Sequence, residues 1–345
     1  GIRVCLLSRG LGDVYKRQRQ DYGILYPYII QSSVTDINWN GKQLWIDDLE
    51  QGRYMAPEIL GDCFVERFIM LLSNITCVTF NRINPVMEAE TEELRVSVVH
   101  ESVARSGYTI SIRKTPAVCR MNKENMIQSG YCSEEIHDFL VRCVKAHCTI
   151  VICGLPGAGK TELLKYLTQF IPSRERAITI EDVMEIHYQT LNPDKDCVEM
   201  KVAENFGYAQ AIKASLRQYP KWIILSEARS KEARQLLESL STGASSLTTL
   251  HGKKVADIPG RILTMAGKEQ ASEGMEYDIY RYIDVGVLVQ GEMDESGKIR
   301  RYIEEIGVFQ ENYEGKNQVA MVAKKGRLNR DKIPRDLKDR LEMEA

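Results

Sequence analysis

Three features are scarce in this sequence: long apolar runs, paired cysteines and net charge. No stretch approaches the roughly 18 consecutive apolar residues that a membrane-spanning helix needs, so any membrane association must go through partner proteins. The net charge of −2 gives no general reason to expect nucleic acid as a partner. The nine cysteines form no C-x-x-C pair, and Cys77, Cys148 and Cys153 lie inside apolar stretches, which predicts buried free thiols in a reducing cytoplasm.

The first residues resemble a remnant of processing. Ser8–Gln18 matches, in translation, the adapter and transposon end of transposase-based sequencing libraries, and the chain does not begin with Met. We therefore expect residues 1–18 to be an artefact that takes no part in the fold, with a natural basic arm as the alternative. On this interpretation the true N-terminus is unknown.

Length and composition predict a globular protein of two domains. A chain of 345 residues, 43% hydrophobic and 27% charged, is longer than one hydrophobic core usually serves. Residues 19–115 predict a small α+β domain. Residues 116–345 predict a linker followed by an α/β domain with a parallel sheet and a C-terminal helical tail.

Period-2 and period-3.6 patterns place the expected elements of the first domain. Asn40-Gly41 predicts a type I′ hairpin turn, and apolar spacing predicts a helix over Pro57–Leu72. The strands are expected at Val34–Trp39, Leu44–Ile46, Leu94–Val99 and Tyr108–Ile112.

The second domain alternates helices and buried strands. Ser133 is the expected cap of a helix, and the tail with Ile333, Leu337 and Leu341 on one stripe predicts a packed or solvated helix rather than a membrane anchor. Buried strands are expected at Cys148–Cys153, Ala177–Ile180 and Trp222–Leu225, and a late strand pair over Ile299–Val308.

The segment Gly154–Thr161 fits the phosphate-binding pattern G-x-x-x-x-G-K-[ST] between a predicted strand and a predicted helix. Glycines let the backbone wrap phosphate oxygens, Lys160 would reach the β/γ-phosphates, and the Thr161 hydroxyl would ligate Mg²⁺. The sequence therefore predicts a site for ATP and Mg²⁺. The expected nucleotide-binding residues here are Gly154, Pro156, Gly157, Ala158, Gly159, Lys160, Thr161 and Glu162.

Carboxylates and a histidine follow three later segments. Glu181, with Asp182 and Glu185 behind it, ends a buried strand and would face Mg²⁺ or the attacking water, although such residues are often only helix caps. Glu227 ends the next apolar strand and is the expected catalytic carboxylate and second Mg²⁺ ligand. His251 would sense the γ-phosphate or be structural.

Arg229 follows Glu227 by two positions. It would contact a phosphate, or pair with Glu232 three residues later.

Several short sequence motifs follow one another along the chain in a fixed order. They are Val34–Gly41, Leu94–Val96 with Thr109–Lys114, Glu181–Glu185, Ser215–Pro220 with Ile224–Arg229, and Thr242–Gly243 with Thr248–His251. Together they resemble the N-terminal segment, the arginine-bearing strands, the aspartate box, the Walker B segment and the histidine box of the type II/IV secretion ATPase superfamily. Within it, the chain looks closest to the tight-adherence (Flp) pilus and conjugative type IV secretion ATPases.

The resemblance implies a RecA-like P-loop ATPase domain behind a small α+β domain. It implies a homo-oligomer, a hexameric ring, with ATP bound between the two domains and with Arg95 and Arg113 reaching the phosphates. It also implies a cytoplasmic motor that meets the membrane through inner-membrane secretion or pilus platform proteins. Direct binding of nucleic acid is not expected.

The sequence departs from the family's usual boxes at four positions. Ala244 and Ser246 replace the usual His and Gly of a histidine box that is one residue shorter, Lys221 replaces an acidic residue, and Ser226 replaces a Gly. Two function hypotheses follow: Mg²⁺-dependent ATP hydrolysis that drives pilus assembly or secretion, and a nucleotide-binding ring scaffold with negligible turnover. A nucleic-acid translocase is a third reading, disfavoured by the near-neutral charge.

Overall fold

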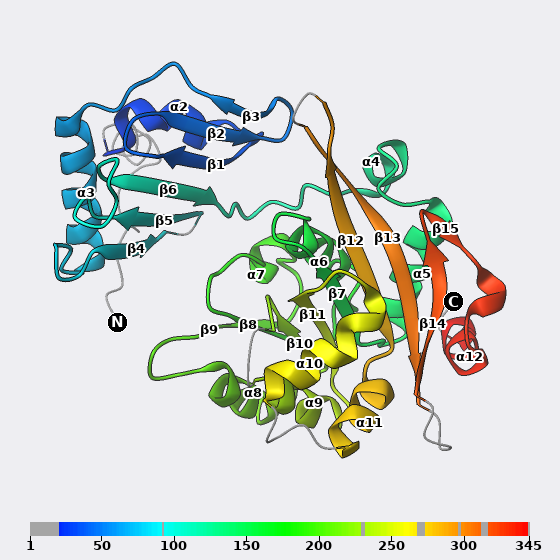
Figure 1. The fold of residues 1–345 in the computed structure, drawn as a ribbon. Coiled ribbons are helices and arrows are strands. Elements are labelled where there is room, and N and C mark those ends of the chain that lie inside the picture. The colour runs from blue at the N-terminus through cyan, green and yellow to red at the C-terminus, as the bar shows by residue number, and fades with distance from the viewer. Residues whose placement is uncertain are drawn as a thin grey trace. The chain divides into compact units, whose positions relative to one another are not determined.

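The computed structural model describes residues 21–91, 93–228, 232–267, 273–295, 298–311 and 317–343. The string expected to be an artefact, residues 1–18, lies outside the described residues. The chain divides into two compact units (Figure 1). Unit 1 comprises residues 1–116 with 293–299, and unit 2 comprises residues 117–292 with 300–345. No helix in the described part of the chain is long and apolar enough to cross a membrane.

Unit 1 is an antiparallel six-stranded sheet in the order β3-β2-β1-β6-β5-β4. Its elements are η1 (Gly23–Leu25), α2 (Tyr26–Ile30), β1 (Val34–Trp39), β2 (Leu44–Asp48), β3 (Gly52–Met55), α3 (Asp62–Thr76), β4 (Val86–Glu90), β5 (Leu94–Val99) and β6 (Thr109–Lys114). Alternate strand residues such as Ile37, Ile46 and Ile112 form one core with the apolar stripe of α3. The other face of the sheet is the polar one, as period-2 alternation dictates.

The predicted β1–β2 hairpin forms, but the prediction of a type I′ turn is wrong. That turn needs a positive φ at both central residues, and only Gly41 has one, at +93°. The Asn40 side chain instead accepts the backbone N–H groups of Lys42 and Gln43 at 3.0 and 2.8 Å, which closes the loop locally. A Cβ at position 41 would lie 2.3 Å from the Ser106 carbonyl oxygen, so only glycine fits there.

Two further expectations in unit 1 are wrong in detail. The helix predicted over Pro57–Leu72 begins only at Asp62, because Gly61 keeps an extended backbone at the N-cap, and it continues to Thr76. Cys77, expected to be buried, is exposed: it ends α3 in the left-handed region, with φ at +55°, on the surface side of the turn. Cys148 and Cys153 are buried, as expected.

Unit 2 is built on a nine-stranded sheet in the order β15-β14-β13-β12-β7-β11-β10-β8-β9. Its strands are β7 (Ile150–Gly154), β8 (Ala177–Glu181), β9 (Cys197–Lys201), β10 (Trp222–Leu225), β11 (Ser245–His251), β12 (Val285–Met293), β13 (Ile299–Gln310), β14 (Gln318–Lys324) and β15 (Arg327–Leu328). Strands β12, β7, β11, β10, β8 and β9 pair in parallel. The strand pair expected over Ile299–Val308 is a single strand, β13, whose partner β14 comes later in the chain.

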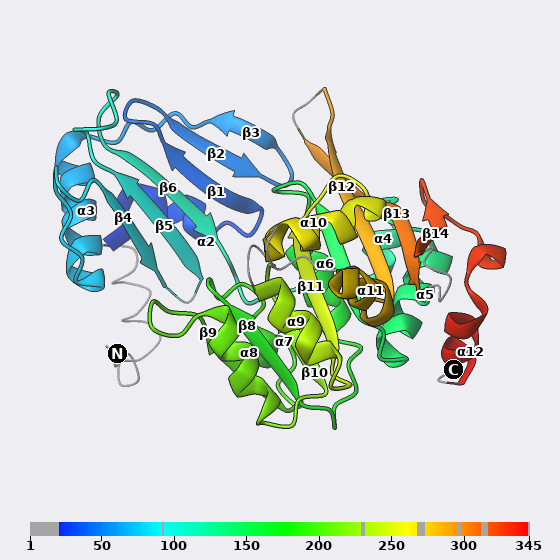
Figure 2. The ribbon, with the colours of Figure 1, turned by 60° about the horizontal axis from the view of Figure 1, so that its bottom comes forward.

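Helices cover both faces of this sheet. They are α4 (Lys123–Gln128), α5 (Glu134–Lys145), α6 (Lys160–Thr168), α7 (Tyr188–Leu191), α8 (Tyr208–Leu216), α9 (Glu232–Leu240), η2 (Val255–Asp257), α10 (Ile258–Ala266), α11 (Glu273–Tyr282), η3 (Arg330–Lys332) and α12 (Arg335–Met343). Helices α8 to α11 pack on one face (Figure 2). The core on the other face takes in α5, α6 and α12. Since both faces are covered, the parallel strands are continuous apolar runs, as the sequence predicts.

Helix α12 is held near the start of β7 by two buried leucines and by hydrogen bonds of Arg340. Leu337 and Leu341 are buried in the core. Arg340 donates to the Asp284 carboxylate at 2.5 Å and to the Ala146 carbonyl oxygen at 3.0 Å. Asp284 also accepts the Thr149 N–H, and burial raises its pKa although Arg340 opposes that shift. The packed tail helix of the sequence interpretation is therefore observed.

We expect Arg340→Met to lower the free energy of unfolding of unit 2 by about 2 kcal/mol, because the partly buried Asp284 carboxylate loses its cation. Urea unfolding measures this loss of free energy, and hydrogen exchange of the β7 amides measures it separately at that strand. The matched control is Arg335→Met on the same helix, whose side chain is 91% exposed and only 4.0 Å from Asp339, and it should cost less than about 0.5 kcal/mol. Equal losses in the two variants would contradict the anchoring role.

Candidate functional site

The four sequence boxes of unit 2 converge on one edge of the parallel sheet. Strand β7 runs into the glycine-rich loop, and the neighbouring strands β11, β10 and β8 end at or beside His251, Glu227 and Glu181. The register pairs His251 with Gly154. Because parallel strands present their carboxyl ends on the same side, residues nearly a hundred positions apart meet there.

The loop itself has the geometry that its glycines predict. Gly157 and Gly159 adopt φ of +76° and +92°, a region that other residues rarely enter. A Cβ on Gly154 would lie 2.5 Å from the Val289 carbonyl oxygen, so close strand packing also requires glycine there. Ala158 is buried, and its N–H donates to the Leu155 carbonyl oxygen at 3.2 Å.

The Lys160 ammonium lies in the loop and has three acceptors around it. It donates to the carbonyl oxygens of Gly154 and Leu155, each at 3.2 Å, and to Nδ1 of His251 at 3.3 Å. The side chain is buried, and burial lowers the pKa of the ammonium, while the nearby Glu227 carboxylate opposes that shift.

His251 links this lysine to Glu227. Its Nε2 lies 2.7 Å from Oε1 of Glu227. An ammonium group can only donate, so Nδ1 must accept from Lys160 and the ring proton must sit on Nε2, from which it is donated to the carboxylate. Lys160, His251 and Glu227 therefore form one hydrogen-bonded series. We call it the Lys160–His251–Glu227 series.

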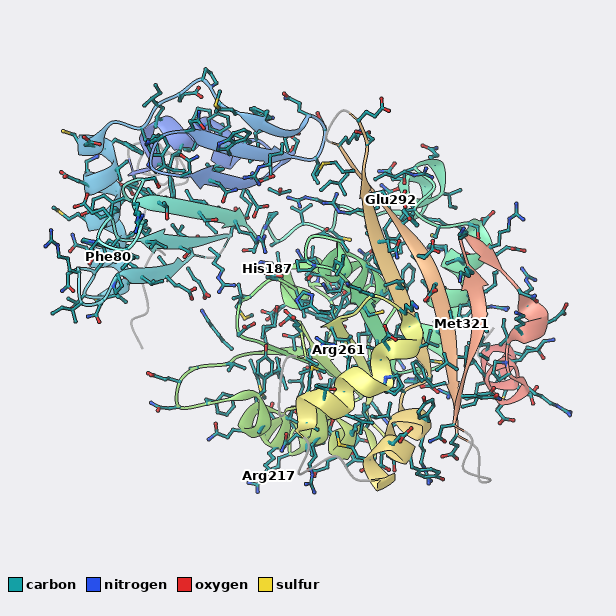
Figure 3. All side chains as sticks on the ribbon, viewed as in Figure 1. Phe80, His187, Arg217, Arg261, Glu292 and Met321 are labelled. Atoms are coloured by element: carbon teal, nitrogen blue, oxygen red, sulfur yellow. The ribbon has the colours of Figure 1, made fainter. Side chains whose placement is uncertain are left out.

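Hydrogen bonds to backbone carbonyl oxygens hold the ends of β10 and β11 in place around the Lys160–His251–Glu227 series. The Thr249 hydroxyl donates to the Ser226 carbonyl oxygen at 2.6 Å, and the Ala228 N–H donates to the Thr249 carbonyl oxygen at 2.8 Å. Arg261 of α10, labelled in Figure 3, donates to the carbonyl oxygen of His251 at 3.2 Å. The segment that carries the altered histidine box is thus a regular, buried strand.

Glu181 occupies a different environment. Its side chain is fully buried, and Oε2 accepts the N–H groups of Glu185 and Ile186 at 2.8 and 2.9 Å. Among the residues that the structure describes, Oε1 has no hydrogen-bond partner. Burial raises the pKa of this carboxyl to about 8, although the two backbone donors oppose the shift. The carboxyl therefore holds the acidic loop after β8 in place, and its raised pKa favours the protonated form at neutral pH.

This pKa has a stability consequence. Between the unfolded value of 4.5 and the folded value of about 8, the native state binds more protons than the unfolded state, so the free energy of unfolding falls as pH rises through that window. Glu181→Gln keeps an acceptor for both N–H groups and removes the titration. We expect the free energy of unfolding of this variant, relative to that of the wild type, to rise by on the order of 3 kcal/mol from pH 5 to pH 9.

Urea unfolding of both proteins at half-unit pH steps measures the difference. The matched control is Glu204→Gln, at an exposed position of the same unit, whose offset from the wild type should not change with pH. A pH-independent offset for Glu181→Gln would mean that the buried carboxyl does not titrate in this window.

The remaining expected residues of the loop lie where the sequence places them. Thr161 and Glu162 open helix α6, both half-buried, and Pro156 lies on the exposed side of the loop. The Glu162 carboxylate accepts the Arg120 N–H at 3.3 Å and lies 3.4 Å from the ammonium of Lys165. Glu162 therefore also fastens the segment that follows residue 116.

Two of the three predicted arginines belong to unit 1. Arg95 and Arg113 are directly opposite each other on β5 and β6 of unit 1. Arg95 lies 3.6 Å from Glu88, and Arg113 lies 2.8 Å from Asp36. Arg229 lies outside the described residues. The expected contacts of these three with a nucleotide stay predictions.

Sequence reasoning missed Arg261 and Arg301. Arg301 of β13 donates through Nε to the Gly157 carbonyl oxygen at 3.0 Å. Arg301 lies 144 positions after the loop residue that it contacts, so no local pattern marks it, and only the strand order of the sheet could have indicated it. Arg261 follows His251 by ten positions on α10, and no sequence motif singles it out.

Comparison with known proteins places the chain in a family. The model of the type II/IV secretion system protein family matches residues 81–289, more than half of the chain. An uncharacterised protein of Bacillus anthracis is 29% identical over 257 residues, 73% of this chain and 58% of that protein. Protein VirB11 of Agrobacterium fabrum is 34% identical over 129 residues, 35% of this chain and 36% of VirB11. The chain thus aligns with less than two thirds of the length of each of these relatives.

A solved structure agrees on the fold. The X-ray structure of the ATPase DotB of Yersinia pseudotuberculosis superimposes with a TM-score of 0.61 at 15% identity, over 84% of this chain and 79% of DotB. The mixed α/β fold expected from the sequence is confirmed, as is the expected superfamily. The chain belongs to the type II/IV secretion system protein family.

Proposed function

We propose that this chain binds MgATP at the loop of unit 2 and hydrolyses it, as a ring-forming motor for pilus assembly or protein secretion. The observation that carries the proposal is the Lys160–His251–Glu227 series at the carboxyl edge of the parallel sheet. It joins a phosphate-binding lysine to a carboxylate that can orient water. A RecA-like core would use that same edge for its nucleotide.

Each residue of the series has a proposed part. On binding, Lys160 exchanges Nδ1 of His251 for a phosphate oxygen, and the loop N–H groups with the start of α6 stabilise the negative charge. Glu227 accepts a proton from, or orients, the attacking water. His251 loses its lysine partner when Lys160 turns to the phosphates, so it reports the occupancy of the site.

The residues present suit a nucleotide-bound Mg²⁺. Thr161 and Glu227 offer hydroxyl and carboxylate oxygens, the ligand type that Mg²⁺ prefers. Within the described residues, no three His, Cys, Asp or Glu side chains assemble a cluster able to hold a metal by themselves. Such an ion takes few protein ligands and completes its shell with phosphates and water, so two oxygen donors are sufficient. When bound, Mg²⁺ would neutralise charge on the phosphates.

Other expected residues complete the proposal. Arg95, Arg113 and Arg229 contact the phosphates when the two domains close on ATP, and Glu181 supports catalysis by fixing the acidic loop. The protein works as a hexamer in the cytoplasm, at the membrane surface, against secretion or pilus platform proteins. VirB11 and DotB, which the chain resembles, lend this proposal its family context.

The test is phosphate release from MgATP across protein concentrations, with a chain that begins at Arg19. Specific activity that rises with concentration and disappears in Glu227→Gln supports an oligomeric ATPase. Activity that is independent of concentration would contradict ring assembly as a condition of turnover.

A nucleotide-dependent scaffold is the second candidate. The observation that favours it is the histidine box, in which Ala244 and Ser246 stand where the family usually has His and Gly. MgATP binding with concentration-dependent assembly, but without phosphate release above that of Glu227→Gln, would select the scaffold over the motor.

A further inference from the structure

Arg301 touches the phosphate-binding loop at two of its glycines. Its Nε donates to the Gly157 carbonyl oxygen at 3.0 Å. Its aliphatic part covers Gly159, since a Cβ there would lie 3.2 Å from Cδ of Arg301. The two contacts join the loop to a strand that lies 144 positions later in the sequence.

The strand that carries Arg301 is firmly held. The Ile303 N–H donates to the Tyr131 carbonyl oxygen at 2.8 Å, and Ile303 and Ile306 are buried in the core. Strand β13 also pairs with β14 over Glu305–Gln310. The Arg301 guanidinium is therefore carried by a strand that is held in place by backbone hydrogen bonds and buried side chains.

The hydrogen bond to the Gly157 carbonyl oxygen also sets the direction of the Ala158 N–H, which belongs to the same peptide unit. A peptide unit is planar and trans, so its carbonyl oxygen and its N–H point in opposite directions. Drawing the Gly157 carbonyl toward Arg301 turns the Ala158 N–H the other way, where it meets Leu155. With two glycines at positive φ, the loop could otherwise rotate at little cost.

We propose that Arg301 is a positioning residue that holds the loop in the conformation that receives phosphate groups. The proposal rests on the nucleotide binding proposed above. Arg301 acts through the Gly157 carbonyl and not by contact with the reacting phosphate. Its effect is therefore on the affinity for MgADP and MgATP alike, and much less on the rate at saturation.

Two variants separate the hydrogen bond from the charge. Arg301→Ala removes both. Arg301→Gln removes the charge but keeps an N–H donor at the same number of bonds from the backbone as Nε. The matched control is Arg300→Ala on the same strand, an exposed arginine whose guanidinium approaches Gly130 instead of the loop.

In the full chain, Arg301→Ala should weaken MgADP and MgATP binding about tenfold, measured by titration calorimetry, with kcat at saturation changed less than about threefold. Arg301→Gln and Arg300→Ala should stay within about threefold of the wild type in affinity. In the nucleotide-free protein, hydrogen exchange of the amides of residues 157–160 should be faster in Arg301→Ala than in Arg301→Gln.

Equal losses in Arg301→Ala and Arg301→Gln would overturn the proposal in favour of a charge effect. A fall in kcat without a change in affinity would overturn it in favour of contact with the transition state. If the wild type binds no nucleotide, the proposed function fails. The exchange experiment then still decides the positioning role, because faster exchange in Arg301→Ala alone supports it and unchanged exchange overturns it.

Discussion

Lys160→Ala is expected to abolish measurable turnover and to weaken MgATP binding roughly 100-fold. The ammonium is the buried donor of the loop, with its donors directed at two loop carbonyls and at His251. Removing it deletes the charge-assisted hydrogen bonds to phosphate and leaves the Nδ1 of His251 without its donor. Fluorescent-nucleotide titration and phosphate release measure the two effects.

The matched control for Lys160→Ala is Lys213→Ala, at an exposed position of α8 in the same unit. It makes the same chemical change and should leave affinity and rate within about twofold of the wild type. Unchanged MgATP affinity in Lys160→Ala would show that the loop of unit 2 is not the nucleotide site.

Glu227→Gln is expected to lower kcat by about 100- to 1,000-fold and to change MgATP affinity less than about threefold. The amide keeps an oxygen that can accept from Nε2 of His251, now at 2.7 Å, so the series and the loop survive. The amide cannot accept a proton from water, so the chemical step is lost while the binding site remains.

Single-turnover phosphate release beside nucleotide titration separates these two effects. Glu238→Gln serves as the control, because that carboxylate is 56% exposed and pairs with Arg234 on the surface of α9. A wild-type rate in Glu227→Gln would remove this carboxylate from catalysis. A large loss of affinity would instead assign it a binding role.

The two variants together divide the site by function. On the proposed function, Lys160 belongs to the part that would bind phosphate, and Glu227 to the part that would act on water. His251 lies between them and is bonded to both. We therefore expect Lys160→Ala to fail in binding and Glu227→Gln to bind without turning over.

Local sequence predicted much of the fold correctly. Ser133 caps α5 by accepting the Ile136 N–H at 3.3 Å, as its position before a helical pattern indicates. The core strands lie at their predicted places because buried parallel strands are short apolar runs. The strand pair predicted over Ile299–Val308 is the single strand β13. The other wrong predictions lie at boundaries: the turn at Asn40, the start of α3 at Asp62, and the exposed Cys77. There a single side-chain or backbone contact decides between alternatives that composition does not separate.

What the sequence by itself determined is the family, the glycine-rich loop and the candidate residues for nucleotide chemistry. These depend on short segments, because φ at glycine, helix capping and strand burial are set by near neighbours. Only the tertiary structure decided that Lys160, His251 and Glu227 form one bonded series, that Glu181 is buried, and that Arg301 contacts the loop. The reason is physical: these contacts depend on strand order and register, which bring distant residues to one sheet edge.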